Sequence, residues 1–309
     1  MLLKEPEFKQ VLPALVMPAT VERTAVRIWS NGVALDGDIY RPKGLCGDRR
    51  VPAVVLSHGW GGSKASGERY AAKFAAAGMV SLCFTHGGWG SSGSRVVLAG
   101  DAPELDGDNE GIAKVRVVRE LLDPLEWLQN FRCAIDYIEG EPNVDPNRIG
   151  AWGTSFGGGV AMHTAANDDR IKVLAVQVAS LSVRSDALVK RGKKRAIDMA
   201  RGDIASVPQG IDTDLFPRLA GTPHLARLLQ FDVTKEAGKL GIPTLMLDAE
   251  HEEFFDVAEN CGKAYAILKA QGAVPLRYQV VQDIDHYGIY FEGFEEGSDA
   301  ALDWFSSYL

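Results

Sequence analysis

The sequence of 309 residues is poor in cysteine, and none of its cysteines lie close together. There is no C-x-x-C pair, and the four cysteines are widely spaced: Cys46, Cys83, Cys133 and Cys261. This pattern argues against a structural zinc site and against the disulfide framework of a small secreted domain. A reducing, cytoplasmic location is therefore the expectation.

Long apolar runs and basic runs are also lacking. No segment stays apolar over the roughly 20 residues that span a bilayer. The stretch 1–18 is broken by charged residues and prolines, unlike a signal peptide. The formal net charge is −8, and no run of Lys and Arg interleaved with aromatic residues is present. We therefore expect neither a membrane nor a nucleic acid as a partner.

The sequence is rich in hydrophobic residues, which make up 46% of the chain, and this is enough to form one large buried core. Short β-rich runs alternate with longer amphipathic runs from about residue 24 onward. This alternation predicts an α/β fold with a mostly parallel eight-stranded sheet flanked by helices. The expected strands are 24–29, 33–40, 52–57, 79–84, 148–152, 173–179, 243–247 and 276–281.

Two local signals refine this prediction. Ser30, Asn31 and Gly32 form a turn signal, so the first two strands are expected to form an edge hairpin. Asp123, followed by proline, is expected to cap a helix that ends at Gly140. The expected core stripe of this helix is Leu125, Leu128, Phe131, Ile135 and Ile138.

A candidate nucleophile lies in Gly153-Thr154-Ser155-Phe156-Gly157, which reads G-x-S-x-G. The two glycines suit a strand-to-helix turn that is too tight for side chains on either side of the serine. The pattern alone is weak evidence in a chain with 33 glycines, and an ordinary glycine-rich turn is the alternative. The strand before it and the apolar helix after it favour Ser155 as a nucleophile.

An anion-binding loop is expected after the third strand, at His58-Gly59-Trp60-Gly61-Gly62. Acyl transfer needs backbone N–H groups that face the developing oxyanion. We expect these donors to be the N–H groups of Trp60 and Phe156. His58 precedes the nucleophile in the chain, so it is expected to hold the loop rather than to act as a base.

The general base and its acid partner should follow Ser155 in the chain. His286 lies just past the last predicted strand and is the expected base, in preference to His163, His224 and His251. Four carboxylates after the seventh strand compete for the role of acid: Asp248, Glu250, Glu252 and Glu253. H-E-x-x-H is absent, so we expect no metal. We expect no other cofactor, because the protein itself supplies every charge that a tetrahedral intermediate needs.

Residues 181–241 interrupt the strand–helix alternation. An unstructured loop of this length is uncommon in a compact domain, so we expect an inserted helical cap or lid. The predicted organisation is a core of residues 1–180 and 242–309 with a cap of residues 181–241. Two roles are equally open for the cap's apolar residues, lining an acyl pocket or docking the cap on the core: Leu215, Phe216, Leu225, Leu228 and Leu229.

Together, these motifs resemble the α/β-hydrolase superfamily over about residues 24–309, apart from the cap. Residues 33–42 resemble the X-Pro dipeptidyl-peptidase and cocaine-esterase group, and the remainder resembles dienelactone-hydrolase-like esterases. In such relatives the acid follows the seventh strand in the pattern h-G-x-x-D. Placing Ala249 at the glycine puts Glu252 at the acid. The resemblance then implies that Asp248 braces the loop, that Glu250 faces solvent and that Glu253 points away.

The chain also departs from these relatives at two places. After the fourth strand, relatives often read D-x-R-G-x-G, whereas this chain reads Thr85-His86-Gly87-Gly88-Trp89-Gly90, so we expect an internal ion pair to be missing. The peptidase group carries a C-terminal β-sandwich, and here only a closing helix is expected before Leu309.

The resemblance implies a serine carboxylesterase that acts on a small-molecule ester through Ser155, His286 and Glu252. A lactonase, a peptidase or a carbon–carbon-bond hydrolase would use the same residues. A catalytically silent ligand-binding protein on this fold is a third interpretation. A homo-oligomer is left open.

Overall fold

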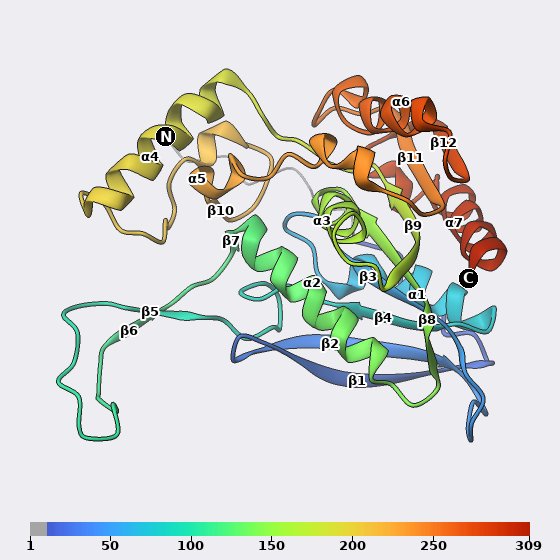
Figure 1. Cartoon of the computed structure of the whole chain (residues 1–309), viewed down its shortest axis with the longest axis horizontal. Helices are drawn as coiled ribbons and strands as arrows, with labels where there is room; N and C mark the ends of the chain where they lie inside the picture. The colour runs from blue at the N-terminus through green and yellow to red at the C-terminus, as the bar shows by residue number, and fades with distance from the viewer. Residues whose placement is uncertain (1–10) are drawn as a thin grey trace.

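The computed structural model describes residues 11–309 (Figure 1). Residues 1–10, on which the expected absence of a signal peptide partly rests, lie outside the described residues. Within the described part of the chain, no helix has both the length and the apolar character needed to cross a bilayer.

A sheet of eight strands forms the centre of residues 11–309, in the order β1-β2-β4-β3-β8-β9-β11-β12. Only the pairings of β2 with β1 and β4 are antiparallel in this sheet, so the predicted mostly parallel arrangement is confirmed. Each predicted strand forms, and most extend a few residues further. The strands are β1 (Val21–Ser30), β2 (Val33–Pro42), β3 (Val51–Ser57), β4 (Val80–Phe84), β8 (Val144–Thr154), β9 (Ile171–Gln177), β11 (Thr244–His251) and β12 (Leu276–Asp285).

The edge hairpin of β1 and β2 is confirmed. Asn31 and Gly32 both have positive φ, 47° and 79°, which is the geometry of a two-residue turn between antiparallel strands. Ser30 pairs with Val33 directly beside this turn.

Helices cover both faces of the sheet (Figure 1). One face packs against α1 (Glu68–Ala76) and α7 (Phe294–Tyr308), whose Phe74 and Phe305 are fully buried. The other face packs against α2 (Pro124–Glu139), α3 (Phe156–Ala165) and α6 (Cys261–Gln271). This layering leaves the carboxyl ends of the parallel strands free to carry loops, where ligands of open α/β sheets bind.

Helix α2 begins and ends as the sequence predicts. The carboxylate of Asp123 accepts a hydrogen bond from the N–H of Leu125 at 3.2 Å, and Gly140 follows the last helical residue. The predicted core stripe is wrong at its start, because Leu125 is 38% exposed and Trp127 is buried in its place. The buried face is therefore Trp127, Phe131, Ala134, Ile135 and Ile138.

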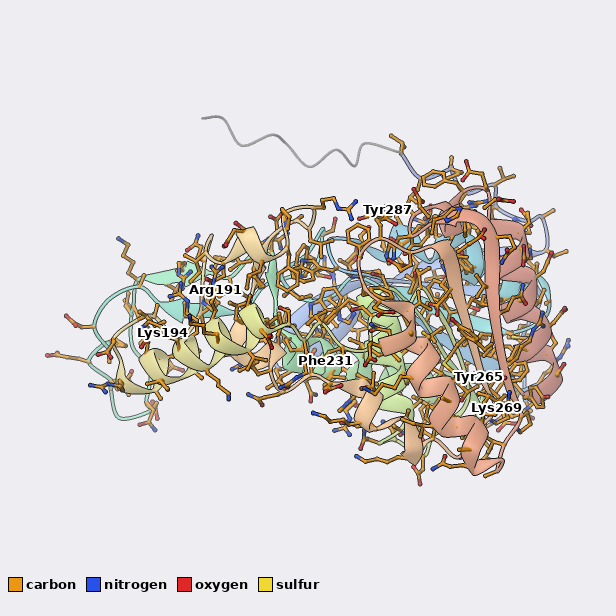
Figure 2. The ribbon with its side chains drawn as sticks, turned by 90° about the horizontal axis from the view of Figure 1, so that it is seen from above. Arg191, Lys194, Phe231, Tyr265, Lys269 and Tyr287 are labelled. Carbon is orange, nitrogen blue, oxygen red and sulfur yellow. The ribbon has the colours of Figure 1, made fainter. Side chains whose placement is uncertain are left out.

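The segment between β9 and β11 contains α4 (Asp186–Arg201), β10 (Thr222–Pro223) and α5 (Leu225–Leu228). β10 pairs with β7 (Leu121–Leu122), which ties this segment to the chain just before α2. Seen from above, Arg191 and Lys194 on α4 lie at the opposite end of the molecule from Tyr265 and Lys269 on α6 (Figure 2). We call this stretch between β9 and β11 the inserted segment, and it extends to one side of the sheet.

Two further kinds of element complete the described chain. β5 (Val96–Leu98) and β6 (Val115–Val117) form an antiparallel ribbon that projects from the body at the lower left of Figure 1. Short 3₁₀ turns lie at Lys64–Ser66, Thr213–Leu215, Val233–Lys235, Ala237–Lys239, Val257–Glu259 and Gly288–Tyr290.

Candidate active site

The turn that carries Ser155 joins β8 to α3 and has a strained backbone. Ser155 adopts φ 53° and ψ −128°, a conformation that residues with a side chain rarely take. A Cβ atom on Gly153 would lie 2.3 Å from the carbonyl oxygen of Gly157, and one on Gly157 would lie 2.2 Å from that of His58. Both glycines of the motif are therefore required by close backbone packing, which holds the serine at the end of the strand.

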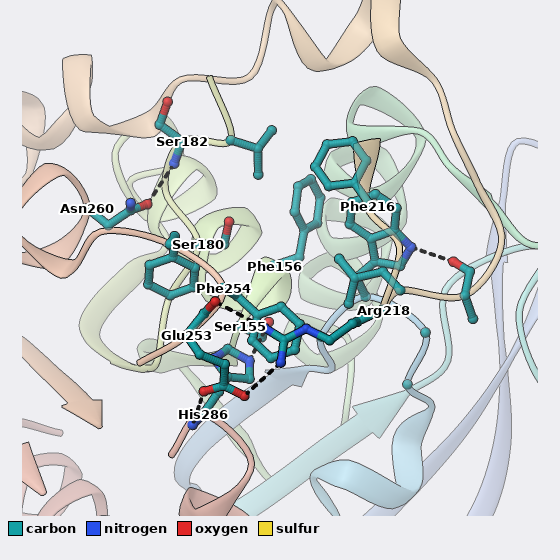
Figure 3. A pocket seen from close by; sticks show the side chains of 18 of the residues that line it. Ser155, Phe156, Ser180, Ser182, Phe216, Arg218, Glu253, Phe254, Asn260 and His286 are labelled. Carbon is teal, nitrogen blue, oxygen red and sulfur yellow. Dashed lines mark hydrogen bonds and ion pairs between the residues drawn. The ribbon is translucent and has the colours of Figure 1, made fainter. Parts of the chain in front are cut away.

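A continuous hydrogen-bonded chain runs from Ser155 through His286 to Glu252 (Figure 3 labels Ser155 and His286). His286 Nε2 lies 3.1 Å from Ser155 Oγ, and Nδ1 lies 2.6 Å from Glu252 Oε2. With its proton on Nδ1, the imidazole donates to Glu252 and can accept the hydroxyl proton of Ser155. The structure thus brings together the three residues that the sequence singled out.

Glu252 is fixed by more than its contact with His286. Its second oxygen, Oε1, accepts a hydrogen bond from the N–H of Phe254 at 2.9 Å. The side chains of Glu252 and His286 are only 1% and 5% exposed. A buried carboxylate that accepts two hydrogen bonds in this way orients the imidazole and can stabilise its cation.

The three other carboxylates after β11 have different surroundings. Asp248 is buried and accepts a hydrogen bond from Tyr278 Oη at 3.0 Å, and burial raises its pKa to about 7. Glu250 is exposed and accepts from the N–H of Asp283. The expectation that Glu253 points away is wrong, because its carboxylate accepts from the backbone N–H of His286 at 3.1 Å. Glu253 therefore supports the main chain of His286, while Glu252 contacts the ring.

The loop after β3 passes directly against the nucleophile. A Cβ atom on Gly59 would lie 2.8 Å from the Cβ of Ser155, so a side chain at position 59 would displace the serine. Trp60 and Phe156, the two expected oxyanion donors, line the same cavity as Ser155. The indole N–H of Trp60 donates to the carbonyl oxygen of Ala220 at 2.7 Å, which connects this loop to the inserted segment.

Beneath this loop, His58 and His86 form a buried neutral pair. His58 Nδ1 donates to the carbonyl oxygen of Gly59 at 2.8 Å, and its Nε2 accepts from the N–H of His86 at 3.0 Å. Burial lowers the pKa of His58 to about 4 and that of His86 well below its usual value. His58 therefore holds the loop in the neutral form, in the structural role expected for it.

His86 occupies the place where relatives carry the charged D-x-R-G-x-G motif. Its ring is stacked on Trp127 with centroids 4.0 Å apart, and its Nε2 lies 2.9 Å from Ser57 Oγ. Neutral side chains therefore surround His86 at this position. Ion pairs lie elsewhere around the site: buried Asp123 pairs with Arg95 and Arg227, and Lys64 pairs with Asp36 and Asp38.

Ser155 and His286 open into a cavity of about 1280 Å³ between the strand ends and the inserted segment (Figure 3). The cavity wall is not uniform. Around Phe156 and Phe216 it is largely apolar, with contributions from Trp60, Trp89, Leu215, Pro217, Leu219, Phe254 and Phe255. Elsewhere it carries hydroxyl, amide and charged groups from Ser180, Ser182, Asp232, Lys235, Asn260 and Lys263.

The residues predicted for an acyl pocket divide between the two roles left open by the sequence. Leu215 and Phe216 line the cavity, and the ring of Phe216 lies 4.8 Å from that of Trp60. Leu225, Leu228 and Leu229 lie outside the lining of this cavity, which corrects the expectation for them. Leu225 and Leu228 belong to the buried core, and Leu229 packs against Gly192 of α4.

One surface group in the described chain has the composition of a metal site. Ligand atoms of Glu250, His251 and Asp283 lie within 4.8 Å of one another. All three residues are exposed, and the carboxylate of Glu250 already accepts the N–H of Asp283. Exposed acidic groups commonly approach one another in this way without an ion. This group is separate from the Ser155–His286–Glu252 chain.

Sequence reasoning missed Arg218, which lines the cavity from the inserted segment. Its guanidinium donates to the carbonyl oxygen of Glu253 at 3.1 Å and lies 4.4 Å from the centre of the Phe254 ring. An isolated arginine in a segment rich in proline and glycine carries no motif, so only the folded chain reveals this contact.

The chain is similar in sequence to a known protein family and to a curated protein. A family model described as X-Pro dipeptidyl-peptidase (S15 family) matches residues 31–215, more than half of the chain. The quorum-quenching protein AidA of Acinetobacter baumannii is 33% identical over 153 residues, which cover 49% of this chain and 42% of that protein. The chain therefore spans less than half the length of that relative.

Solved structures share the fold at low sequence identity. DcsB, determined in complex with its substrate analogue, has a TM-score of 0.69 at 18% identity, covering 93% of this chain and 99% of that chain. An acetyl xylan esterase from Paenibacillus sp. R4 has a TM-score of 0.59 at 20% identity, covering 97% and 88%. At these identities the likeness establishes the fold alone.

Proposed function

This chain belongs to the X-Pro dipeptidyl-peptidase (S15) family and has the α/β-hydrolase fold, and from that premise we propose that it is a serine carboxylesterase. The observation that carries the proposal is the hydrogen-bonded chain Ser155–His286–Glu252 at the floor of a large cavity. A nucleophile, a base within 3.1 Å and an acid that orients the base are the three groups that acyl transfer requires.

In the proposed reaction, Ser155 Oγ attacks the ester carbonyl carbon while His286 Nε2 takes the hydroxyl proton. The negative charge on the tetrahedral intermediate is stabilised by the backbone N–H groups of Trp60 and Phe156. His286 then gives the proton to the departing alkoxide, which leaves as the alcohol. A water molecule attacks the acyl-enzyme with His286 as base, and the carboxylic acid leaves as Ser155 recovers its proton.

The cavity favours a bulky ester over an acetyl ester. Its volume of about 1280 Å³ exceeds the roughly 300–1,000 Å³ typical of small-molecule sites. The apolar wall around Phe216 and Phe156 suits an aliphatic or aromatic group. We therefore propose that medium-length or branched acyl esters are better substrates than acetate esters.

The proposal is tested by covalent labelling together with a substrate panel. A fluorophosphonate should label the wild-type enzyme at Ser155, and p-nitrophenyl esters of increasing acyl length should be hydrolysed faster than matched amides. Lactones, dipeptide amides and β-diketones belong in the panel because the same three residues can cleave them. Faster turnover of any of these classes than of the esters would contradict the carboxylesterase assignment.

Replacing the nucleophile provides the strongest single test. Ser155→Ala should lower kcat/KM by about 10⁶-fold, to near background, as removal of a serine nucleophile does elsewhere. The unfolding temperature should change little, because the side chain is small and lies on a turn. Hydrolysis within tenfold of the wild-type rate would remove Ser155 from the mechanism.

A further inference from the structure

A short part of the inserted segment, residues 215–220, touches both sides of the catalytic cavity; we call it the strap. On one side, the carbonyl oxygen of Ala220 accepts the indole N–H of Trp60 at 2.7 Å. On the other side, Arg218 donates from Nη2 to the carbonyl oxygen of Glu253 at 3.1 Å. The strap therefore connects the loop after β3 to the loop after β11.

The contact at Glu253 continues to the base. The carboxylate of Glu253 accepts the backbone N–H of His286 at 3.1 Å, and Arg218 Nη1 lies 3.8 Å from its Oε1 (Figure 3). Arg218 is thus two contacts away from the main chain of His286, and neither contact involves Ser155.

A second route runs through Phe254. The guanidinium carbon of Arg218 lies 4.4 Å from the centre of the Phe254 ring, whose centre lies 4.8 Å from that of the His286 ring. The N–H of the same residue, Phe254, donates to Glu252. Arg218 therefore braces the residues on both sides of the Glu252–His286 contact.

We propose that Arg218 is a positioning residue, which holds residues 252–254 in place and thereby keeps the imidazole of His286 against Ser155. This inference rests on the proposed hydrolase function. Arg218 does not touch the reacting atoms, and its role is to limit the motion of a loop that carries both the acid and the support of the base.

Arginine is suited to this role in a way that lysine is not. Its planar fork donates to a carbonyl oxygen while its flat face lies against an aromatic ring. The side chain of Arg218 is 55% exposed and that of Glu253 is 31% exposed, so their ion pair alone contributes little. The directed hydrogen bond and the ring contact carry the effect together, whereas a lysine ammonium, a compact point charge without a planar face, can make one of them but not both at once.

The test compares Arg218→Gln and Arg218→Lys with a matched control, Arg201→Gln. Arg201 lies on α4 in the same inserted segment, is 73% exposed, pairs with Asp203 and does not line the cavity. The measurements are kcat and KM on a p-nitrophenyl ester, the rate at which a fluorophosphonate labels Ser155, and the thermal unfolding temperature of each variant.

Arg218→Gln should lower kcat and the labelling rate together by about five- to tenfold, the factor expected for one exposed cation–π contact and one hydrogen bond. KM should change less than about twofold, because ground-state binding does not use this contact. The logarithm of kcat for Arg218→Lys should lie closer to that of Arg218→Gln than to that of the wild type. Arg201→Gln should have the kcat and the labelling rate of the wild type.

The outcomes separate the two levels of inference. If the wild-type enzyme is labelled and Arg218→Gln retains wild-type kcat and labelling rate, the positioning role is overturned while the proposed function stands. A change in KM alone overturns positioning in favour of direct substrate contact. A wild-type enzyme that resists labelling overturns the proposed function, and the role of Arg218 with it. An unfolding temperature close to wild type, with the expected loss of kcat, supports the proposal.

Discussion

The two halves of the catalytic site are built by different means. On the nucleophile side, main-chain atoms set the geometry: Gly59, Gly153 and Gly157 each pack so closely that a Cβ atom would overlap its neighbour. On the acid–base side, His286 and Glu252 lie in the loops after β12 and β11, and side-chain hydrogen bonds hold them. The first half rests on close main-chain packing, within the turn of Ser155 and between that turn and the loop after β3. The second rests on side-chain hydrogen bonds between the loops after β11 and β12.

After removal of Ser155 itself, the largest expected loss of turnover comes from a change in the acid–base half alone. Glu252→Gln should lower kcat by roughly 10³- to 10⁴-fold with little change in KM, as loss of an orienting carboxylate does in related chemistry. The same change at exposed Glu250 should cost far less. Steady-state kinetics on one ester measures both, and near-normal kcat for Glu252→Gln would show that another carboxylate orients His286.

Overpacking the main chain around the nucleophile should instead lower stability. Gly157→Ala forces a methyl group to within 2.2 Å of the carbonyl oxygen of His58, so the turn must shift. We expect a loss of about 3 kcal/mol or more in the free energy of unfolding, at the upper end of the range for overpacking. Urea denaturation measures it, with Gly241→Ala as the control because a Cβ atom there meets nothing within 4 Å.

A third comparison separates two residues of the inserted segment. Phe216→Ala should alter the ranking of short against long acyl esters and leave stability nearly unchanged, because Phe216 lines the cavity and is only partly buried. Leu228→Ala should cost about 2–5 kcal/mol of stability without altering that ranking, because Leu228 is fully buried in the core. If both variants changed only stability, the lining role of Phe216 would be wrong.

The smallest effect concerns pH and the buried histidines. Burial lowers the pKa of His86 in the folded chain. As the pH falls below about 6.5, His86 is therefore protonated in the unfolded chain but stays neutral in the folded chain, and the folded chain loses stability. The raised pKa of Asp248 acts in the opposite direction. Comparison with His86→Phe isolates the histidine and retains an aromatic ring against Trp127.

Between pH 6 and pH 5, the unfolding free energy of the wild type should therefore fall more steeply than that of His86→Phe, by about 1.4 kcal/mol per pH unit. Urea denaturation at several pH values measures both slopes. Parallel slopes would show that His86 takes up a proton equally in the folded and unfolded chain.

The difference between the two halves also explains what the sequence could predict. Strand alternation and the G-x-S-x-G turn are local patterns, so the sheet, the hairpin and the strand–turn–helix setting of Ser155 could be predicted from the sequence. The structure also brings His286 and Glu252 together as expected, although their catalytic roles stay predictions. The sequence could not predict how Glu253 is oriented, that Arg218 contacts Glu253, or that Leu228 is buried. Each of these depends on residues far away in the chain.

The contact between Trp60 and Ala220 has an optical consequence. The chain has six tryptophans, of which those at positions 89, 127, 152 and 304 are buried and Trp29 is 66% exposed on the edge hairpin. Trp60 lines the cavity and is joined to the strap through its indole N–H, so its emission should respond when this hydrogen bond is lost and water reaches the ring. The difference spectrum between the wild type and Trp60→Phe is thus a fluorescence signal from the cavity wall, and it should report loss of the contact with the strap without any attached dye.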